Sequence, residues 1–286
     1  MDTQLSFDPV TDIRELVAYP FMVSALEAGT IVALVAAVAG WFMVLRRESF
    51  AGHTLSVMSF PGASGAALAG LPLALGYFAS CAIAAVAIAG GSLAAGQRER
   101  RQEVAVVGTV QVAGFALGFV FLSLYHGVLE SLESLLFGSF LGITQGQVET
   151  LLAVGLAALA FFAIAGRPLL YASVDENLAR ARGVRVRLLH VMFLLVLGLS
   201  VAATAQITGV LLVFALLVAP AAAARQITPR IGLGLVLTAA IALAATWVGL
   251  GLAYFTDRSS GFYVTTIAFG FYVLATTGRT IAGRIG

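Results

Sequence analysis

The sequence predicts an all-α fold, a polytopic transmembrane helical bundle of about nine spans. Of the 286 residues, 60% are hydrophobic and only 10% are charged, whereas about a quarter of the residues in a soluble domain are charged. Uncharged apolar runs of about 20 residues recur along the chain, and a helix of that length crosses the hydrocarbon core. The runs lack the alternation of a membrane β-barrel, so helices are expected to satisfy the backbone.

The expected spans follow the apolar runs in chain order, and eight to ten spans are compatible with the sequence. Their approximate bounds are 20–45, 52–70, 72–95, 104–124, 146–166, 188–204, 207–225, 231–254 and 261–281. Polar residues interrupt the segment 125–145, which is expected to form a short external or re-entrant helix; the alternative is a tenth span.

Orientation follows from the basic residues, all sixteen of which are arginines. Placing the loops near 46, 98, 167–187 and 225–230 and the C-terminal end in the cytosol leaves only Arg14 and Arg258 outside. The positive-inside rule then favours an external N-terminus and a cytosolic C-terminus.

The sequence lacks the motifs of a membrane-embedded or nucleotide-hydrolysing enzyme. It has no GxxxxGK phosphate loop, no HExxH motif and one cysteine, Cys81, in an apolar run. The chain is therefore not expected to be an enzyme or to bind a cofactor of its own. Membrane lipid is an expected partner, and nucleic acid is not.

A polar segment at residues 171–189, "YASVDENLARARGVRVRLL", interrupts the apolar pattern. Ser173 and Glu176 have the spacing of a capping box, and Asp175 and Glu176 suit the positive end of a helix dipole. Gly183 supplies a stop signal, so a short helix over about 174–182 is expected outside the membrane. Its Ala179 and Gly183 spacing indicates a docking surface; the alternative is an arginine-rich loop that only sets topology.

The segment "RRESFAGHTLSVMSFPGASGAALAG", residues 46–70, is polar and kinked within the apolar chain. Pro61 lacks an N–H, so a kink with an exposed carbonyl one turn earlier is expected. Gly62, Ala66 and Gly70 form a stripe of small residues for close helix contact. His53 and Pro61 share an adjacent face.

Three stretches resemble the membrane subunit of the zinc, manganese and iron family of ABC importers. They are "VLRRESFAGHTLSVMSFPGASGAALAG", "DENLARARGVRVRLL" and "GVLLVFALLVAPAAAARQ", and the likeness runs from "PFMVSALEAG" to "FYVTTIAFGFYVLA". The resemblance implies that residues 1–286 form a single transmembrane permease domain in the cytoplasmic (inner) cell membrane, moving divalent metal ions.

The resemblance also implies partners. They are a second copy of the chain, two separate ABC ATPase subunits that use ATP, and an external metal-binding protein. The loop resembling residues 173–185 would seat in a groove of the ATPase, which makes 173–183 the cytosolic coupling helix. The candidate coupling residues are Ser173, Asp175, Glu176, Ala179, Arg182 and Gly183.

One departure from the family pattern affects the expected metal path. The family presents an aspartate and, one turn later, a histidine, whereas this chain has His53 and Val57 there. A single imidazole does not offset the dehydration of a divalent ion as a pair would. The remaining candidate donors are Met58 and Ser59; alternatively, His53 is a capping or interfacial residue.

Glu27 is a second candidate for the path because it lies within the first span. An intramembrane carboxylate is costly and is expected to face a cavity or a partner. The alternative is a shallow position reached by external water.

Two other functions remain open from the sequence. A permease for chelated iron or cobalamin-type cargo fits a path without the aspartate and histidine pair. A secondary transporter fits a broken helix, although no inverted repeat is evident.

Overall fold

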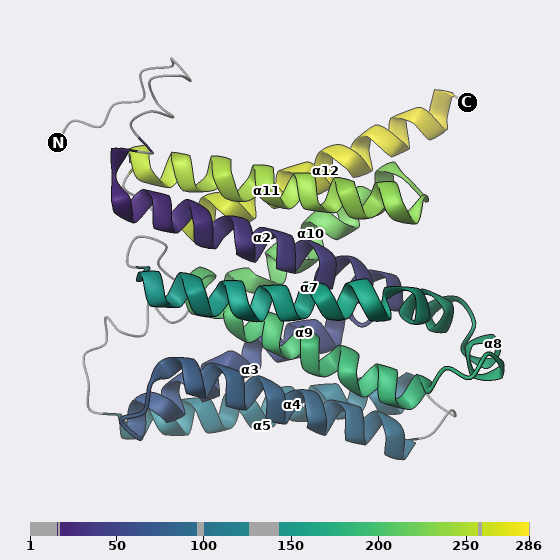
Figure 1. The fold of residues 1–286 in the computed structure, drawn as a ribbon, viewed down its shortest axis with the longest axis horizontal. Coiled ribbons are helices and arrows are strands. Elements are labelled where there is room, and N and C mark those ends of the chain that lie inside the picture. Colours follow the sequence, from purple (N-terminus) through teal and green to yellow (C-terminus); the bar gives the residue numbers. More distant parts are fainter. Residues whose placement is uncertain (1–15, 17, 96–99, 126–142, 257–258, 286) are drawn as a thin grey trace.

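The computed structural model describes residues 16, 18–95, 100–125, 143–256 and 259–285, and these residues form an all-α bundle (Figure 1). The helices run in the order α2 (Pro20–Arg46), α3 (Ser49–Leu68), α4 (Leu73–Ala95), α5 (Arg100–Leu124), α7 (Gln145–Val174), α8 (Glu176–Ala181), α9 (Val186–Thr208), α10 (Val210–Ile227), α11 (Ile231–Thr256) and α12 (Ser260–Ile285). The predicted helix at 125–145 lies almost entirely outside the described residues.

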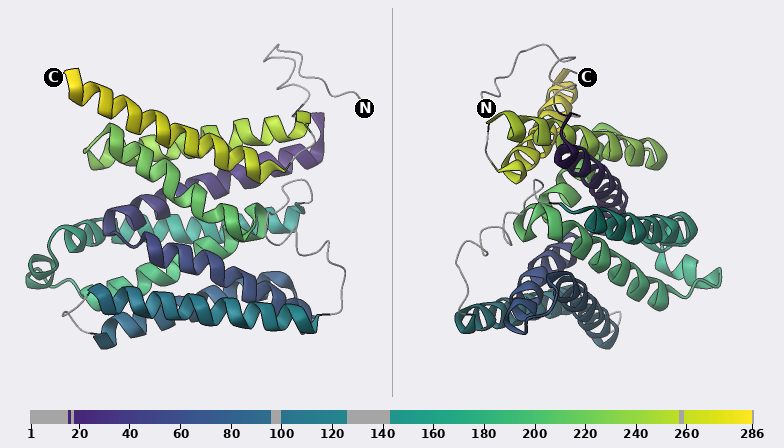
Figure 2. Two further views of the ribbon diagram at one scale, coloured as in Figure 1. Left: turned by 180° about the vertical axis from the view of Figure 1, so that it is seen from behind. Right: turned by 60° about the vertical axis from the view of Figure 1, so that its left-hand side comes forward.

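The long helices pack in two groups with α7 and α9 between them (Figures 1 and 2). Helices α3, α4 and α5 contact one another on one side. On the other side, α2, α10 and α11 contact one another, and α12 packs on α10 and α11. Helix α9 touches α3 and α4 as well as α2, α7 and α10. It therefore joins the two groups.

Small residues allow the closest helix contacts. Gly40 of α2 abuts the backbone carbonyl of Leu217 in α10, and Gly62 of α3 abuts the backbone of Gly76 in α4. Any larger side chain at these positions would meet backbone atoms, which cannot rotate away. The small-residue pattern thus sets the helix spacing, as is common in membrane bundles.

The predicted count of about nine spans is wrong. Among the described residues, seven helices are long and apolar enough to cross a membrane. They match seven of the predicted runs. The other two runs, 52–70 and 207–225, correspond to α3 and α10, which do not meet the length and hydropathy of a candidate span. The predicted sides of the two termini, which rested on the distribution of the arginines, are not confirmed.

Helices α3 and α10 fall short of the length or hydropathy of a candidate span, and both lie inside the bundle. Helix α3 contains Pro61 and buries Thr54, Ser56, Ser59 and Ser64, and the apolar part of α10 described in full is only Val213–Ile227. Each helix contacts four or more others, so protein surrounds both. An apolar outer surface is therefore not required of them.

The outer helices expose large apolar side chains, as a multi-pass membrane protein requires. Ile83 of α4 is 68% exposed, Val112 of α5 is 70% exposed and Ile164 of α7 is 81% exposed. Exposure of this extent on successive helices is unfavourable in water and favourable in lipid.

Candidate functional site

Helix α3, which contains Pro61, holds His53 at the contact with α10. The imidazole is half-buried, and its centroid lies 4.8 Å from that of Phe214 in an edge-on arrangement. Its Nδ1 atom is buried and has no hydrogen-bond partner among the described residues. His53 is thus a histidine at a helix interface with an uncommitted buried nitrogen.

Gly62, which follows Pro61, lies in close contact with α4. Helix α3 continues past Pro61 to Leu68. Gly62 meets the carbonyl of Gly76 and the side chain of Ser80, while Ala66 meets Gly76 one turn later. Gly62 and Ala66 of the predicted small-residue stripe therefore contact α4; Gly70 follows α3 with a φ of 67°.

The structure does not bring Met58 and Ser59 together with His53. The Met58 thioether packs against Gly114 of α5. The Ser59 hydroxyl and the Cys81 thiol of α4 lie 3.3 Å apart, and Cys81 also donates to the Leu55 carbonyl. Within the described ranges, no group of three or more His, Cys, Asp or Glu side chains could hold a metal ion.

Glu27 lies on the surface of α2. Its side chain is exposed, and Thr30, one turn later, accepts a hydrogen bond from the indole of Trp247 in α11 at 3.0 Å. This part of α2 therefore lies against α11.

The polar loop forms helix α8, but its cap differs from the predicted one. The Asp175 carboxylate accepts hydrogen bonds from the backbone N–H groups of Asn177 and Leu178 at 2.9 and 3.0 Å. Ser173 instead donates to the Leu169 carbonyl at 2.6 Å within α7. Because α7 continues to Val174, Ser173 is helical and cannot cap α8, and Glu176 pairs with Arg180 on the surface.

Helix α8 is anchored on one side and exposed on the other. Ala179 is fully buried, and Gly183 adopts a φ of 80° that favours glycine and ends the helix. The Arg182 guanidinium lies 5.4 Å from the centre of the Tyr171 ring. Leu178 is 50% exposed, so the outward face carries apolar and basic groups.

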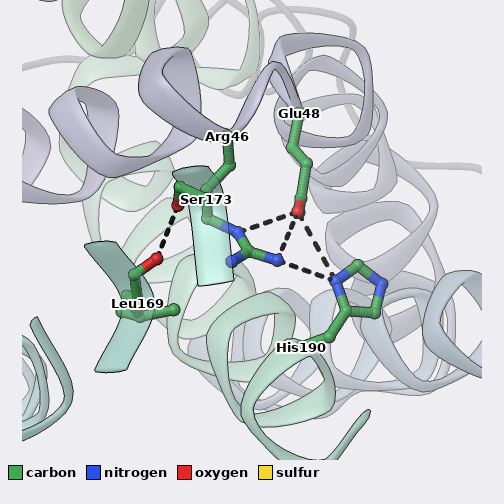
Figure 3. A network of polar contacts seen from close by, with 5 residues as sticks. All are labelled: Arg46, Glu48, Leu169, Ser173 and His190. Atoms are coloured by element: carbon green, nitrogen blue, oxygen red, sulfur yellow. Dashed lines mark hydrogen bonds and ion pairs between the residues drawn. The ribbon is translucent and has the colours of Figure 1, made fainter. Parts of the chain in front are cut away.

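The sequence did not predict an ionic network at the same end of the bundle. Arg46 of α2 and Glu48, which precedes α3, form an ion pair of 2.8 Å. His190 Nδ1 of α9 lies 3.2 Å from an Arg46 nitrogen and 3.5 Å from the Glu48 carboxylate (Figure 3). The only signal in the sequence was an acidic residue directly after two arginines in a short turn.

Opposing effects act on the pKa of Glu48. Burial would raise this pKa, but the contact with His190 and the charge of Arg46 together lower it below its ordinary value. Glu48 is therefore a buried carboxylate held in its charged form.

The comparisons with known proteins agree with this architecture. The chain is 30% identical over 261 residues to the manganese transport system membrane protein MntC of Halalkalibacterium halodurans, covering 91% of this chain and 88% of the relative. It is 31% identical over 263 residues to the chelated iron transport system membrane protein YfeD of Yersinia pestis, covering 92% and 87%.

A solved structure and a family profile extend the similarity to nearly the whole chain. PsaBC from Streptococcus pneumoniae in complex with Fab superposes with a TM-score of 0.80 at 26% identity, covering 93% of this chain and 94% of that chain. The profile described as the ABC 3 transport family matches residues 18–279. The chain therefore belongs to the ABC 3 transport family.

Proposed function

We propose that residues 1–286 form the membrane permease domain of an ABC importer that moves divalent manganese or iron across the cell membrane. The observation that carries this proposal is helix α8, a capped polar helix between α7 and α9, in a chain of this transport family. The two relatives named above are membrane proteins of a manganese and of a chelated iron transport system.

We infer that α8 is a cytosolic coupling helix that docks a separate ATPase, which uses the ATP. Ala179 anchors the helix against the bundle, while Leu178 and Arg182 are exposed. An apolar side chain beside a guanidinium suits a protein groove with carboxylates at its rim. A homodimeric permease with two ATPases and an external metal-binding protein completes the proposed importer.

The proposed path for the ion passes His53. This residue lies in the first half of α3 at the contact with α10, and its buried Nδ1 has no hydrogen-bond partner among the described residues. Imidazole suits divalent transition metals. A site with one strong donor binds weakly, which suits a transport path that must release its ion. No resident metal or cofactor is proposed.

A second candidate cargo is chelated iron. Its support is the absence of a multi-donor metal group from the described residues, since a chelate supplies its own donors. The relative YfeD is named for a chelated iron transport system.

Uptake of radioactive manganese and iron tests these proposals. Cells that lack other importers would express the permease with its ATPase and binding protein. His53→Ala should lower uptake about tenfold, as typically follows from perturbing a metal site, at an unchanged membrane level. Met58→Leu, which conserves packing volume, should leave uptake unchanged.

Three outcomes would revise the proposal. Wild-type uptake by His53→Ala would remove His53 from the path and direct attention to Glu27. Iron uptake only in the presence of a chelator would favour chelated cargo. An absence of ATP-dependent uptake of both metals, free or chelated, would overturn the proposed function.

A further inference from the structure

The turn between α2 and α3 is fixed to the start of α9 by three converging charged or ionisable side chains. Arg46 Nε donates to the Glu48 carboxylate at 2.9 Å, and its terminal nitrogen lies 3.2 Å from His190 Nδ1. These side chains are only 10%, 13% and 14% exposed, respectively. Figure 3 shows them converging, with Ser173 and Leu169 of α7 in the same region.

Apolar packing holds the same network in place. The Arg46 guanidinium lies 4.8 Å from the centre of the Phe193 ring, and Phe193 is fully buried in α9. Arg46 therefore contacts α9 through two residues, Phe193 and His190. A flat guanidinium has fixed donor directions and can stack on an aromatic ring, so this arrangement specifies one relative position of α2 and α9.

On one side, the network is close to α8 along the chain. Helix α8 ends at Ala181 and α9 begins at Val186. The Val184 N–H donates to the Ala179 carbonyl at 3.0 Å, which ties the connecting turn to the buried anchor of α8. A displacement of α8 would therefore reach the first turns of α9 directly.

On the other side, the network is close to His53. The Glu48 carbonyl accepts the Gly52 N–H at 3.0 Å, so Glu48, directly before α3, is hydrogen-bonded to its first turn. His53 follows five positions later, a rise of about 7.5 Å along a helix. Movement of the turn at Glu48 would therefore carry His53 with it.

We infer that Arg46, Glu48 and His190 are positioning residues that link α8, through the start of α9, to His53 on α3. The inference rests on the proposed transport function. Helix faces that share only apolar contacts can slide past one another, whereas a buried ionic network has discrete arrangements. The network would make the ATPase-docking end of α9 and the first half of α3 move as one unit.

The ratio of metal uptake to ATP hydrolysis tests this link in proteoliposomes that contain the complete importer. Glu48→Gln keeps the shape of the side chain and removes its charge. It should leave ATPase co-purification and basal hydrolysis near wild type while lowering metal ions moved per ATP about tenfold, a typical size for coupling between sites. Glu149→Gln, at an exposed carboxylate on α7, should leave the ratio unchanged.

A double-variant cycle distinguishes the link from general damage. His190→Gln should lower the same ratio, and combining it with Glu48→Gln should lower it no further, because both substitutions break one network. A merely structural role would reduce the amount of assembled importer and leave the ratio intact.

The outcomes separate the link from the transport function itself. If wild-type vesicles move no metal, the proposed function fails. If they move metal and Glu48→Gln keeps the wild-type ratio, or the two substitutions act additively, the inference is overturned. If the Glu48→Gln importer does not assemble, Arg46→Lys tests the link instead. This substitution keeps the positive charge but loses the planar fork of the guanidinium. An unchanged ratio of metal moved to ATP hydrolysed in Arg46→Lys would reject the link.

Discussion

At the scale of single residues, Glu48 shows how burial and charge are balanced in this chain. A carboxylate removed from water is stable only if it is paired. Arg46 supplies the charge at 2.8 Å, and His190 Nδ1 lies 3.5 Å away. One Glu48 oxygen, Oε2, is buried with no hydrogen-bond partner among the described residues, so the ionic contacts concentrate on the other oxygen.

The lowered pKa of Glu48 predicts a pH dependence of stability. A folded pKa below the unfolded one contributes stability above the unfolded value of about 4.3, and this contribution is lost as the pH falls through the folded pKa. At pH 7, Glu48→Gln should reduce the free energy of unfolding by about 3 kcal/mol, because it leaves Arg46 buried without its counter-charge.

Thermal unfolding of the detergent-purified protein, measured from neutral to acidic pH, checks this dependence. The melting temperatures of wild type and Glu48→Gln should converge as the pH falls, while Glu149→Gln should follow wild type throughout. A gap that widens on acidification would contradict the assigned sign.

At the scale of helices, the cap of α8 predicts different effects for substitutions of Asp175 and of Ser173. Asp175→Ala removes the acceptor for the Asn177 and Leu178 N–H groups and should cost about 1 kcal/mol of local helix stability. Co-purification of the ATPase should therefore weaken.

Ser173→Ala is the matched control for that cap. Its hydroxyl bonds within α7, so this substitution should retain ATPase binding. Weaker binding by Ser173→Ala than by Asp175→Ala would support the capping box expected from the sequence over the observed cap.

The contact between α3 and α4 gives a second prediction at this scale. Gly76→Val would force atoms against the backbone of Gly62 and the side chain of Ala66. It should lower the free energy of unfolding by about 3 kcal/mol, the upper range for overpacking.

Gly90→Val is the control because Gly90 lies on the same helix with open space around it. It should change the melting temperature little, since valine has an acceptable helix propensity. Equal melting temperatures for the two variants would exclude the close α3 and α4 contact as a determinant of stability.

At the scale of the whole molecule, α3 is surrounded by other helices. A second metal-binding side chain on α3 is therefore expected to increase the retention of metal in the proposed path. Val57 is 3% exposed and lies one turn after His53. Val57→His would place two imidazoles on one helical face and should increase metal retention about tenfold, while slowing release.

Metal content of the purified permease, measured by mass spectrometry, checks this effect. Val57→Leu is the control for altered packing and should retain no more metal than wild type. Equal retention by Val57→His and Val57→Leu would argue against a path along this face.

The sequence alone determined where the seven long apolar helices lie and where the polar loop interrupts them. These features depend on local properties: the length of an apolar run, a glycine that tolerates positive φ at Gly183, and basic residues between spans. The resemblance seen in the motifs also identified the family correctly, because those motifs are local.

Only the tertiary structure decided what each helix contacts. The apolar runs of the sequence placed α3 and α10 among the expected spans, but a run of residues does not reveal that other helices surround both of them. Asp175, not Ser173, caps α8, because α7 continues through Ser173 to Val174. Arg46 and His190 are 144 positions apart, and no local pattern encodes their contact; it exists because packing of α9 against α2 buries both side chains beside Glu48.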